Sequence, residues 1–100
     1  MKSTKKETKE YVREYVKIDT MEVGRVALTR TGTAFFDCII NGVNIYSAHV
    51  VEPEGKQPFI SWPAVKAKNG NYYNSVYVWI SPEDQAKLIQ LVQDKIDEQD

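Results

Sequence analysis

Hydrophobic and polar positions alternate with a period of two over most of the chain and with a helical period only at its end. Alternation between turn residues predicts strands. Five segments show it: Met21–Arg30, Thr33–Ile40, Val43–Glu52, Phe59–Ala67 and Tyr72–Ile80. They are separated by Gly- and Pro-containing stretches, as expected for the turns and loops of an antiparallel sheet.

The last twenty residues predict a helix. Ser81 suits the N-cap and Pro82 the first helical position. Apolar side chains then recur at steps of three and four and form one stripe: Ala86, Leu88, Ile89, Val92 and Ile96. The expected fold is therefore α+β, a curved antiparallel sheet of four or five strands followed by one amphipathic C-terminal helix that packs on one face.

Two Asn-Gly pairs, Asn41-Gly42 and Asn69-Gly70, lie between strand segments. This dipeptide favours a two-residue type I′ turn, in which both central residues have positive φ. A two-residue turn at Asn69-Gly70 places Lys66 opposite Tyr73 and Trp62 opposite Tyr77. Pro63 cannot donate to a ladder, and a bulge there would exchange the faces of residues 59–62.

With that register, the two faces of the last hairpin differ in character, because side chains alternate along a strand. The aliphatic face suits the helix stripe. The other face carries large aromatic side chains edged with lysine: Trp62, Lys66, Lys68, Tyr73, Tyr77 and Trp79. Aromatic rings beside cations suit unpaired nucleic-acid bases, which stack on the rings while lysine meets the phosphates. Burial in the core, burial in a homodimer, or contact with another partner would also account for the rings.

Composition narrows the class of protein. The chain has 100 residues, of which 42% are hydrophobic and 27% charged. These values fit a single globular domain, expected over residues 20–98 after a basic, partly mobile N-terminal arm, residues 1–19. No apolar run is long enough to span a membrane, so we expect a cytoplasmic protein without a membrane partner.

Charge is divided unevenly along the chain. Residues 81–100 carry six acidic side chains and two lysines, whereas residues 1–80 carry eleven basic and eight acidic side chains. An acidic end and a mildly basic body favour contact of one surface with a polyanion. Arg25 is the arginine that we expect to join the lysines at the phosphates.

Catalysis is not expected. His49 and Cys38 are the only histidine and cysteine. An unbroken first hairpin places His49 opposite Ala34 and Cys38 opposite Ile45, on one face but apart, which does not support a nucleophile pair. We expect no catalytic residue, metal, cofactor or small-molecule substrate.

Several motifs resemble the stage V sporulation protein G family: the stretch Met21–Arg30, the order His49–Glu52 then Phe59–Pro63, and the group Lys66, Gly70 and Tyr72. A second similarity, in Ile80–Glu83 and the terminal helix, is to positive-cofactor transcriptional coactivators and to phage single-stranded-DNA-binding proteins. These resemblances imply a homodimer with an antiparallel sheet and a C-terminal helix that binds nucleic acid without chemistry.

From the rings, the lysines and these resemblances, the sequence predicts a phage-type single-stranded-DNA-binding protein, largely sequence-independent, acting in DNA replication or recombination. Its expected contacts are Arg25, Trp62, Lys66, Lys68, Tyr73, Tyr77 and Trp79. Two alternatives stay open. One is a regulator that binds duplex DNA or RNA, and the other is a protein-interaction module or inhibitor that uses the aromatic patch.

Overall fold

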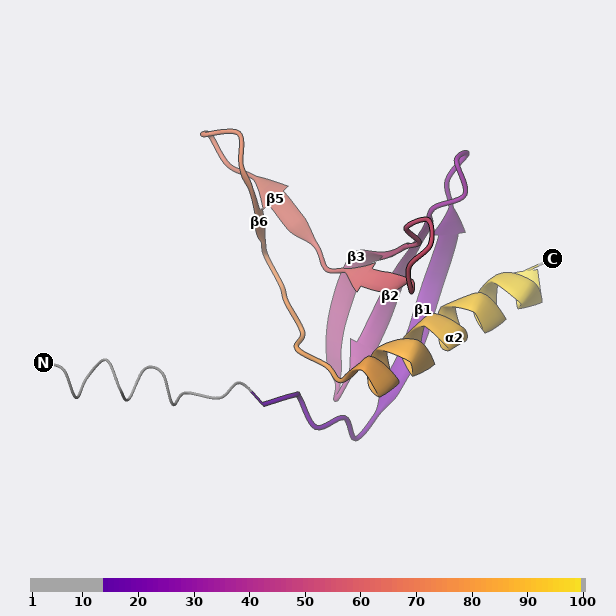
Figure 1. Ribbon diagram of the computed structural model, residues 1–100. Helices are drawn as coiled ribbons and strands as arrows, with labels where there is room; N and C mark the ends of the chain where they lie inside the picture. Colours follow the sequence, from indigo (N-terminus) through magenta and orange to yellow (C-terminus); the bar gives the residue numbers. More distant parts are fainter. Residues whose placement is uncertain (1–13, 100) are drawn as a thin grey trace, which may run out of the picture.

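The computed structural model describes residues 14–99 and confirms an α+β fold of antiparallel strands followed by one helix (Figure 1). The elements, in chain order, are β1 (Met21–Leu28), β2 (Ala34–Ile40), β3 (Val43–Val51), β4 (Phe59–Ser61), β5 (Ala64–Lys66), β6 (Tyr72–Asn74) and α2 (Pro82–Gln99). Strands β1 to β4 form one open sheet in that order, and β5 and β6 form a separate two-stranded ribbon. We call this ribbon, with its connecting loop, the arm.

The arm exists because the predicted strand Phe59–Ala67 is interrupted. Pro63 has no N–H to place in a ladder, and the chain leaves the sheet after Ser61 and pairs again only from Ala64. The prediction of one strand over Tyr72–Ile80 is also wrong, because pairing ends at Asn74. The arm consequently projects from the body instead of extending the four-stranded sheet (Figure 1).

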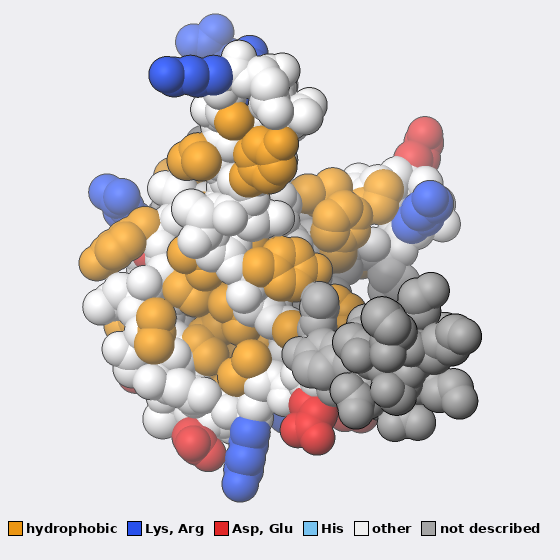
Figure 2. Space-filling model, turned by 90° about the vertical axis from the view of Figure 1, so that its left-hand side faces the viewer, with side chains coloured by type: hydrophobic (Ala, Val, Ile, Leu, Met, Phe, Trp, Pro, Cys, Tyr) orange, Lys and Arg blue, Asp and Glu red, His pale blue; other side chains and the backbone are white. Residues whose placement is uncertain are grey.

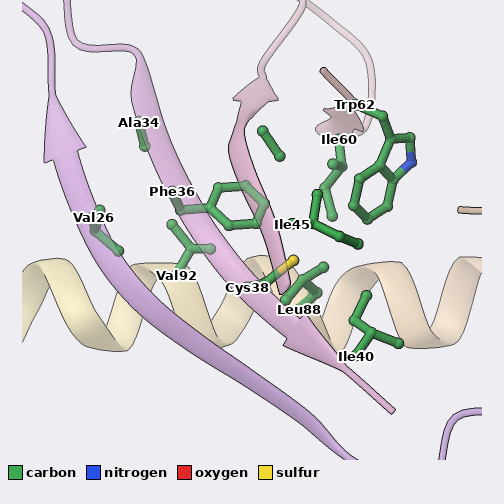
Figure 3. Packing of buried hydrophobic residues seen from close by; sticks show 11 residues of the cluster. Val26, Ala34, Phe36, Cys38, Ile40, Ile45, Ile60, Trp62, Leu88 and Val92 are labelled. Carbon is green, nitrogen blue, oxygen red and sulfur yellow. The ribbon is translucent and has the colours of Figure 1, made fainter. Parts of the chain in front are cut away.

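The core lies between one face of the four-stranded sheet and α2 (Figure 3). Its buried side chains alternate along the strands, as half-buried strands require. They are Val26, Ala34, Phe36, Cys38, Ile40, Ile45, Ala48, Ile60, Trp62, Leu88 and Val92. The predicted helix stripe is thereby confirmed at its centre, since Leu88 and Val92 are buried and Ile89 and Ile96 pack against the cluster.

The start of α2 follows the predicted capping pattern. The Ser81 hydroxyl oxygen accepts a hydrogen bond from the Asp84 amide at 3.1 Å, which satisfies one of the unpaired donors of the first turn. The Gln85 side-chain oxygen accepts a bond from the Ile60 amide at 3.0 Å. The helix is thus attached to β4, the edge strand of the sheet, by a polar contact as well as by core packing.

The β2–β3 hairpin has the predicted two-residue turn, with φ of 51° at Asn41 and 82° at Gly42. Beyond the turn, β3 contains a bulge at Ser47, where φ is 64° and the amide donates to the Asp37 carboxylate at 2.9 Å. The extra residue shifts His49 from the expected partner Ala34 to Phe35. A second bulge, between Val23 and Val26, interrupts the β1–β2 register.

The arm has a different turn from the one predicted. The Gly70 amide donates to the Ala67 carbonyl at 3.0 Å, and the Ala67 amide donates to the Asn71 carbonyl at 2.8 Å. Only Gly70 has positive φ, 90°, so the loop has three residues, a turn followed by a glycine bulge. Lys66 therefore pairs with Tyr72, and Val65 with Tyr73, one residue away from the predicted register. A slip of one residue exchanges the faces, so Lys66 and Tyr73 do not share a face.

Residues 14–20 pack along the domain. Residues 1–13 of the N-terminal segment that was predicted to be basic and partly mobile lie outside the described part of the chain. The Val16 amide donates to the Trp79 carbonyl at 2.7 Å. The Asn41 side chain donates to the Lys17 carbonyl at 2.8 Å and accepts from the amides of Asp19 and Thr20. One turn residue thus fixes the path by which the chain enters β1.

Asn41 has two roles: it adopts positive φ in the turn, and its side chain bonds residues 17, 19 and 20. Two substitutions separate these roles. Asn41→Gly keeps a residue that adopts positive φ but removes the side-chain bonds, and we expect the free energy of unfolding to fall by about 1 kcal/mol. Asn41→Ala removes the same bonds and also replaces Asn, which tolerates the left-handed region, with a residue that tolerates it less well, and we expect a loss of about 2–3 kcal/mol. Urea unfolding followed by circular dichroism measures both. Equal losses in the two variants would contradict this division.

Candidate nucleic-acid interface

The outer face of the four-stranded sheet, which points away from α2, carries a row of side chains that crosses the strands. Phe35 on β2 pairs with His49 on β3, and His49 pairs with Ser61 on β4. The rings of Phe35 and His49 lie 4.8 Å apart between centroids, at an interplanar angle of 31°. The bulge at Ser47 makes this contact possible, because it brings His49 onto the same face as Phe35.

This row continues onto the arm through a shared hollow of about 520 Å³. Its lining includes Phe35, Ser47, His49, Ser61, Ala64 and Tyr72. Tyr72 is 68% exposed and lies directly opposite Lys66 in the arm. The rings of Phe35, His49 and Tyr72 therefore border one open surface, and Lys66 stands beside the outermost of these rings. We call this surface the ring groove.

The charges near the ring groove are mostly positive. The chain has no Asp or Glu between Glu54 and Glu83, a stretch that includes the whole arm and its two lysines, Lys66 and Lys68. On the sheet, Arg25 borders a hollow with Phe35 and Asp37, and its side chain is 82% exposed. Arg25 is 3.6 Å from the Asp37 carboxylate, so part of its charge is balanced.

Tyr73 points to the other side of the arm from Tyr72, since neighbouring strand residues face opposite ways. Its hydroxyl oxygen accepts a hydrogen bond from the Asn69 side chain at 3.2 Å. Hydrogen bonds from the Asn69 and Asn71 side chains lower the pKa of the Tyr73 phenol. Tyr73 is 52% exposed and so presents a ring, but one away from the ring groove.

Tyr77 and Trp79 lie together with Tyr15 in a second aromatic group. The Trp79 ring is stacked with that of Tyr15 at 5.5 Å and 23°, and with that of Tyr77 at 6.3 Å and 28°. With Phe59 they border a hollow of about 280 Å³. Figure 2 shows hydrophobic side chains extending from the arm to the body, with Lys or Arg side chains at the end of the arm.

Trp62 does not lie on an aromatic face, and its predicted placement is wrong. The side chain is 5% exposed and packs into the core near Ile45, Ile60 and Leu88 (Figure 3). The chain turns inward at Trp62 because the strand stops at Pro63, which exchanges the faces of residues 59–62. Phe59, on the opposite face of the same segment, is accordingly 44% exposed. Trp62 borders the ring groove but offers no open ring face for stacking.

The predicted contact residues do not form one surface in the structure. Lys66 lies opposite Tyr72 of the ring groove, and Arg25 borders the neighbouring hollow. Lys68 lies in the arm loop, and Tyr77 and Trp79 form a separate group. The residues that the sequence reasoning did not assign to a site are Phe35, His49, Tyr72 and Tyr15. The β3 bulge pairs Phe35 with His49, and Phe35 and Tyr72 line the same hollow.

Cys38 and His49 are on opposite faces of the sheet, not on one face as expected, because of the same β3 bulge. Burial, and to a lesser degree the nearby Asp37 carboxylate, raises the pKa of the Cys38 thiol to about 11. The thiol therefore stays protonated at neutral pH and is a poor nucleophile. Within residues 14–99 there is no cluster of three or more His, Cys, Asp or Glu side chains arranged to hold a metal ion.

Searches against protein-family models, curated proteins and solved structures found no match to this chain. The resemblance to the stage V sporulation protein G family stays a prediction. No helix within the described residues has the length and apolar character needed to cross a membrane. The assignment of this surface as a nucleic-acid interface therefore depends on its side chains and their charges.

Proposed function

We propose that the protein binds single-stranded DNA, largely independently of base sequence, and catalyses no reaction. The observation that carries the proposal is the ring groove, in which Phe35, His49 and Tyr72 border one open hollow beside Lys66. Unpaired bases expose their flat faces, whereas bases inside a duplex are stacked on one another. Rings on an open surface thus suit a single strand.

Different side chains near the groove suit the bases and the sugar-phosphate backbone of a strand. Stacking of one base on one ring contributes about 1–3 kcal/mol and is available to every base. Lys66 and Lys68 on the arm and Arg25 on the sheet are placed to attract phosphates along the strand. Stacking on a ring does not depend on which base is stacked, which favours binding with little sequence preference.

The wider role follows the sequence resemblances. Phage single-stranded-DNA-binding proteins act in replication or recombination, and we propose the same role for this protein as a homodimer in the cytoplasm of a bacterial or phage-infected cell. Binding in the ring groove does not require a second copy, because its three rings come from one chain.

Titration of fluorescently labelled oligothymidine, followed by anisotropy, tests the proposal. We expect saturable binding at about 50 mM salt. Three phosphate contacts predict a slope of log affinity against log salt of about −2, so affinity should fall about 20-fold at fourfold higher salt. Oligocytidine of the same length should bind with similar affinity. Absence of binding to either oligomer at low salt would contradict the proposal.

A further inference from the structure

We propose that the arm enters the major groove of a DNA duplex, so that the protein binds most tightly where duplex and single strand meet. The single-strand part of this inference rests on the proposed function. The duplex part rests on the shape, charge and position of the arm, which the ring groove alone does not explain.

The arm has the shape of a groove-binding element. It is a two-stranded antiparallel ribbon that leaves the body of the protein (Figure 1). All six of its strand residues are exposed. The major groove of DNA, about 12 Å wide, admits a two-stranded ribbon. An isolated two-stranded hairpin is only marginally stable in water, so a partner that contacts both faces would stabilise it.

The base of the arm is held firmly enough to transmit such a contact. The Asn74 side chain donates to the carbonyls of Trp62, at 3.0 Å, and Pro63, at 3.2 Å. The Ser75 amide donates to the same Pro63 carbonyl at 2.9 Å. Because Trp62 belongs to the core, these bonds connect the arm directly to the packed part of the domain.

The charge and polarity of the arm complement a duplex. Lys66 and Lys68 lie in the arm, and no acidic side chain lies within it. The loop carries Asn69, whose side-chain oxygen accepts from the Asn71 amide at 2.9 Å, so that the loop is internally braced. The acidic side chains of α2 belong to another element, and repulsion from DNA phosphates would favour an orientation in which the arm leads.

The position of the arm relative to the ring groove points to a junction. Tyr72 on β6 and Ala64 on β5 line the hollow that Phe35 and His49 border on the sheet. A duplex on the arm would therefore end near these rings, where the first unpaired base of a continuing strand meets a stacking surface. The arm and the groove would then contact different parts of one tailed DNA molecule.

The test compares three DNAs of matched sequence by anisotropy: an oligothymidine tail alone, a blunt duplex, and the duplex carrying that tail. We expect the tailed duplex to bind at least about tenfold more tightly than the tail alone, since it adds phosphate contacts. Lys66→Gln with Lys68→Gln should weaken binding of the tail alone and weaken binding of the tailed duplex more, so that most of this gain is lost, whereas Lys87→Gln, on exposed α2 surface, should leave the gain unchanged. A tailed RNA duplex should show no gain, because its deep, narrow major groove excludes a ribbon.

The possible outcomes separate the two proposals. Equal affinity for the tail and the tailed duplex overturns the junction inference and leaves single-strand binding intact. A gain that survives the double lysine substitution overturns the role of the arm. Binding to the blunt duplex without any binding to the tail overturns the proposed function while supporting the arm in a groove, and absence of binding to all three DNAs overturns both.

Discussion

Replacement of Tyr72 by alanine is expected to weaken oligothymidine binding by about 5- to 150-fold. Loss of one stacking ring costs about 1–3 kcal/mol, and each 1.4 kcal/mol corresponds to a factor of ten in affinity. Tyr72 is the most exposed ring of the groove and lies opposite Lys66, so a base stacked on it has a phosphate contact within reach. Anisotropy titration at fixed salt measures the change.

Tyr73→Ala is the matched control, because Tyr73 is the next residue on the same strand and is exposed to a similar degree. It faces away from the ring groove, and we expect its removal to change oligothymidine affinity by less than about twofold. Tyr72→Phe keeps the ring and should bind like the unchanged protein. A larger loss in Tyr73→Ala than in Tyr72→Ala would place the binding surface on the other side of the arm, as the original register predicted.

The two Asn-Gly pairs show where sequence reasoning holds and where it stops. In the β2–β3 hairpin, one face of both strands is buried, and any slip would expose Phe36 or Cys38. Burial therefore fixes the register that the Asn41-Gly42 turn predicts, as far as the pair Cys38 and Ile45 before the bulge. In the arm, both faces are exposed, so no core contact opposes a slip of one residue. The energies of the loop itself then decide, and they favour a three-residue loop ending at Gly70.

The bulges could not be read from the sequence, although their effect on the site is large. Nothing in the residues around Ser47 resembles a turn signal, yet Ser47 adopts positive φ and is stabilised by the Asp37 carboxylate from the neighbouring strand. This is a contact between residues ten apart, and local patterns do not contain it. The contact between Phe35 and His49 depends on it, which is why His49 was not expected in the site.

The core and the helix were predictable because local patterns in the sequence determine them. Alternating side chains of β2, and the stripe of α2, have only one way to remove their apolar surface from water. Pro63 also indicated an interruption of the strand, because a residue without an N–H cannot continue a central strand. What the sequence did not reveal was whether Trp62 would turn outward or into the core.

Substitution of Trp62 decides between these two roles. Trp62 is a core side chain that is 5% exposed. We expect Trp62→Ala to lower the free energy of unfolding by about 3–5 kcal/mol, and urea denaturation measures this loss. Trp62→Phe keeps most of the apolar volume and should lose less stability, so that the folded variant can be titrated with oligothymidine. We expect its affinity to stay within about twofold, because stacking in the ring groove uses other rings. A tenfold loss of affinity in Trp62→Phe, with stability unchanged, would instead show that Trp62 meets the bases directly.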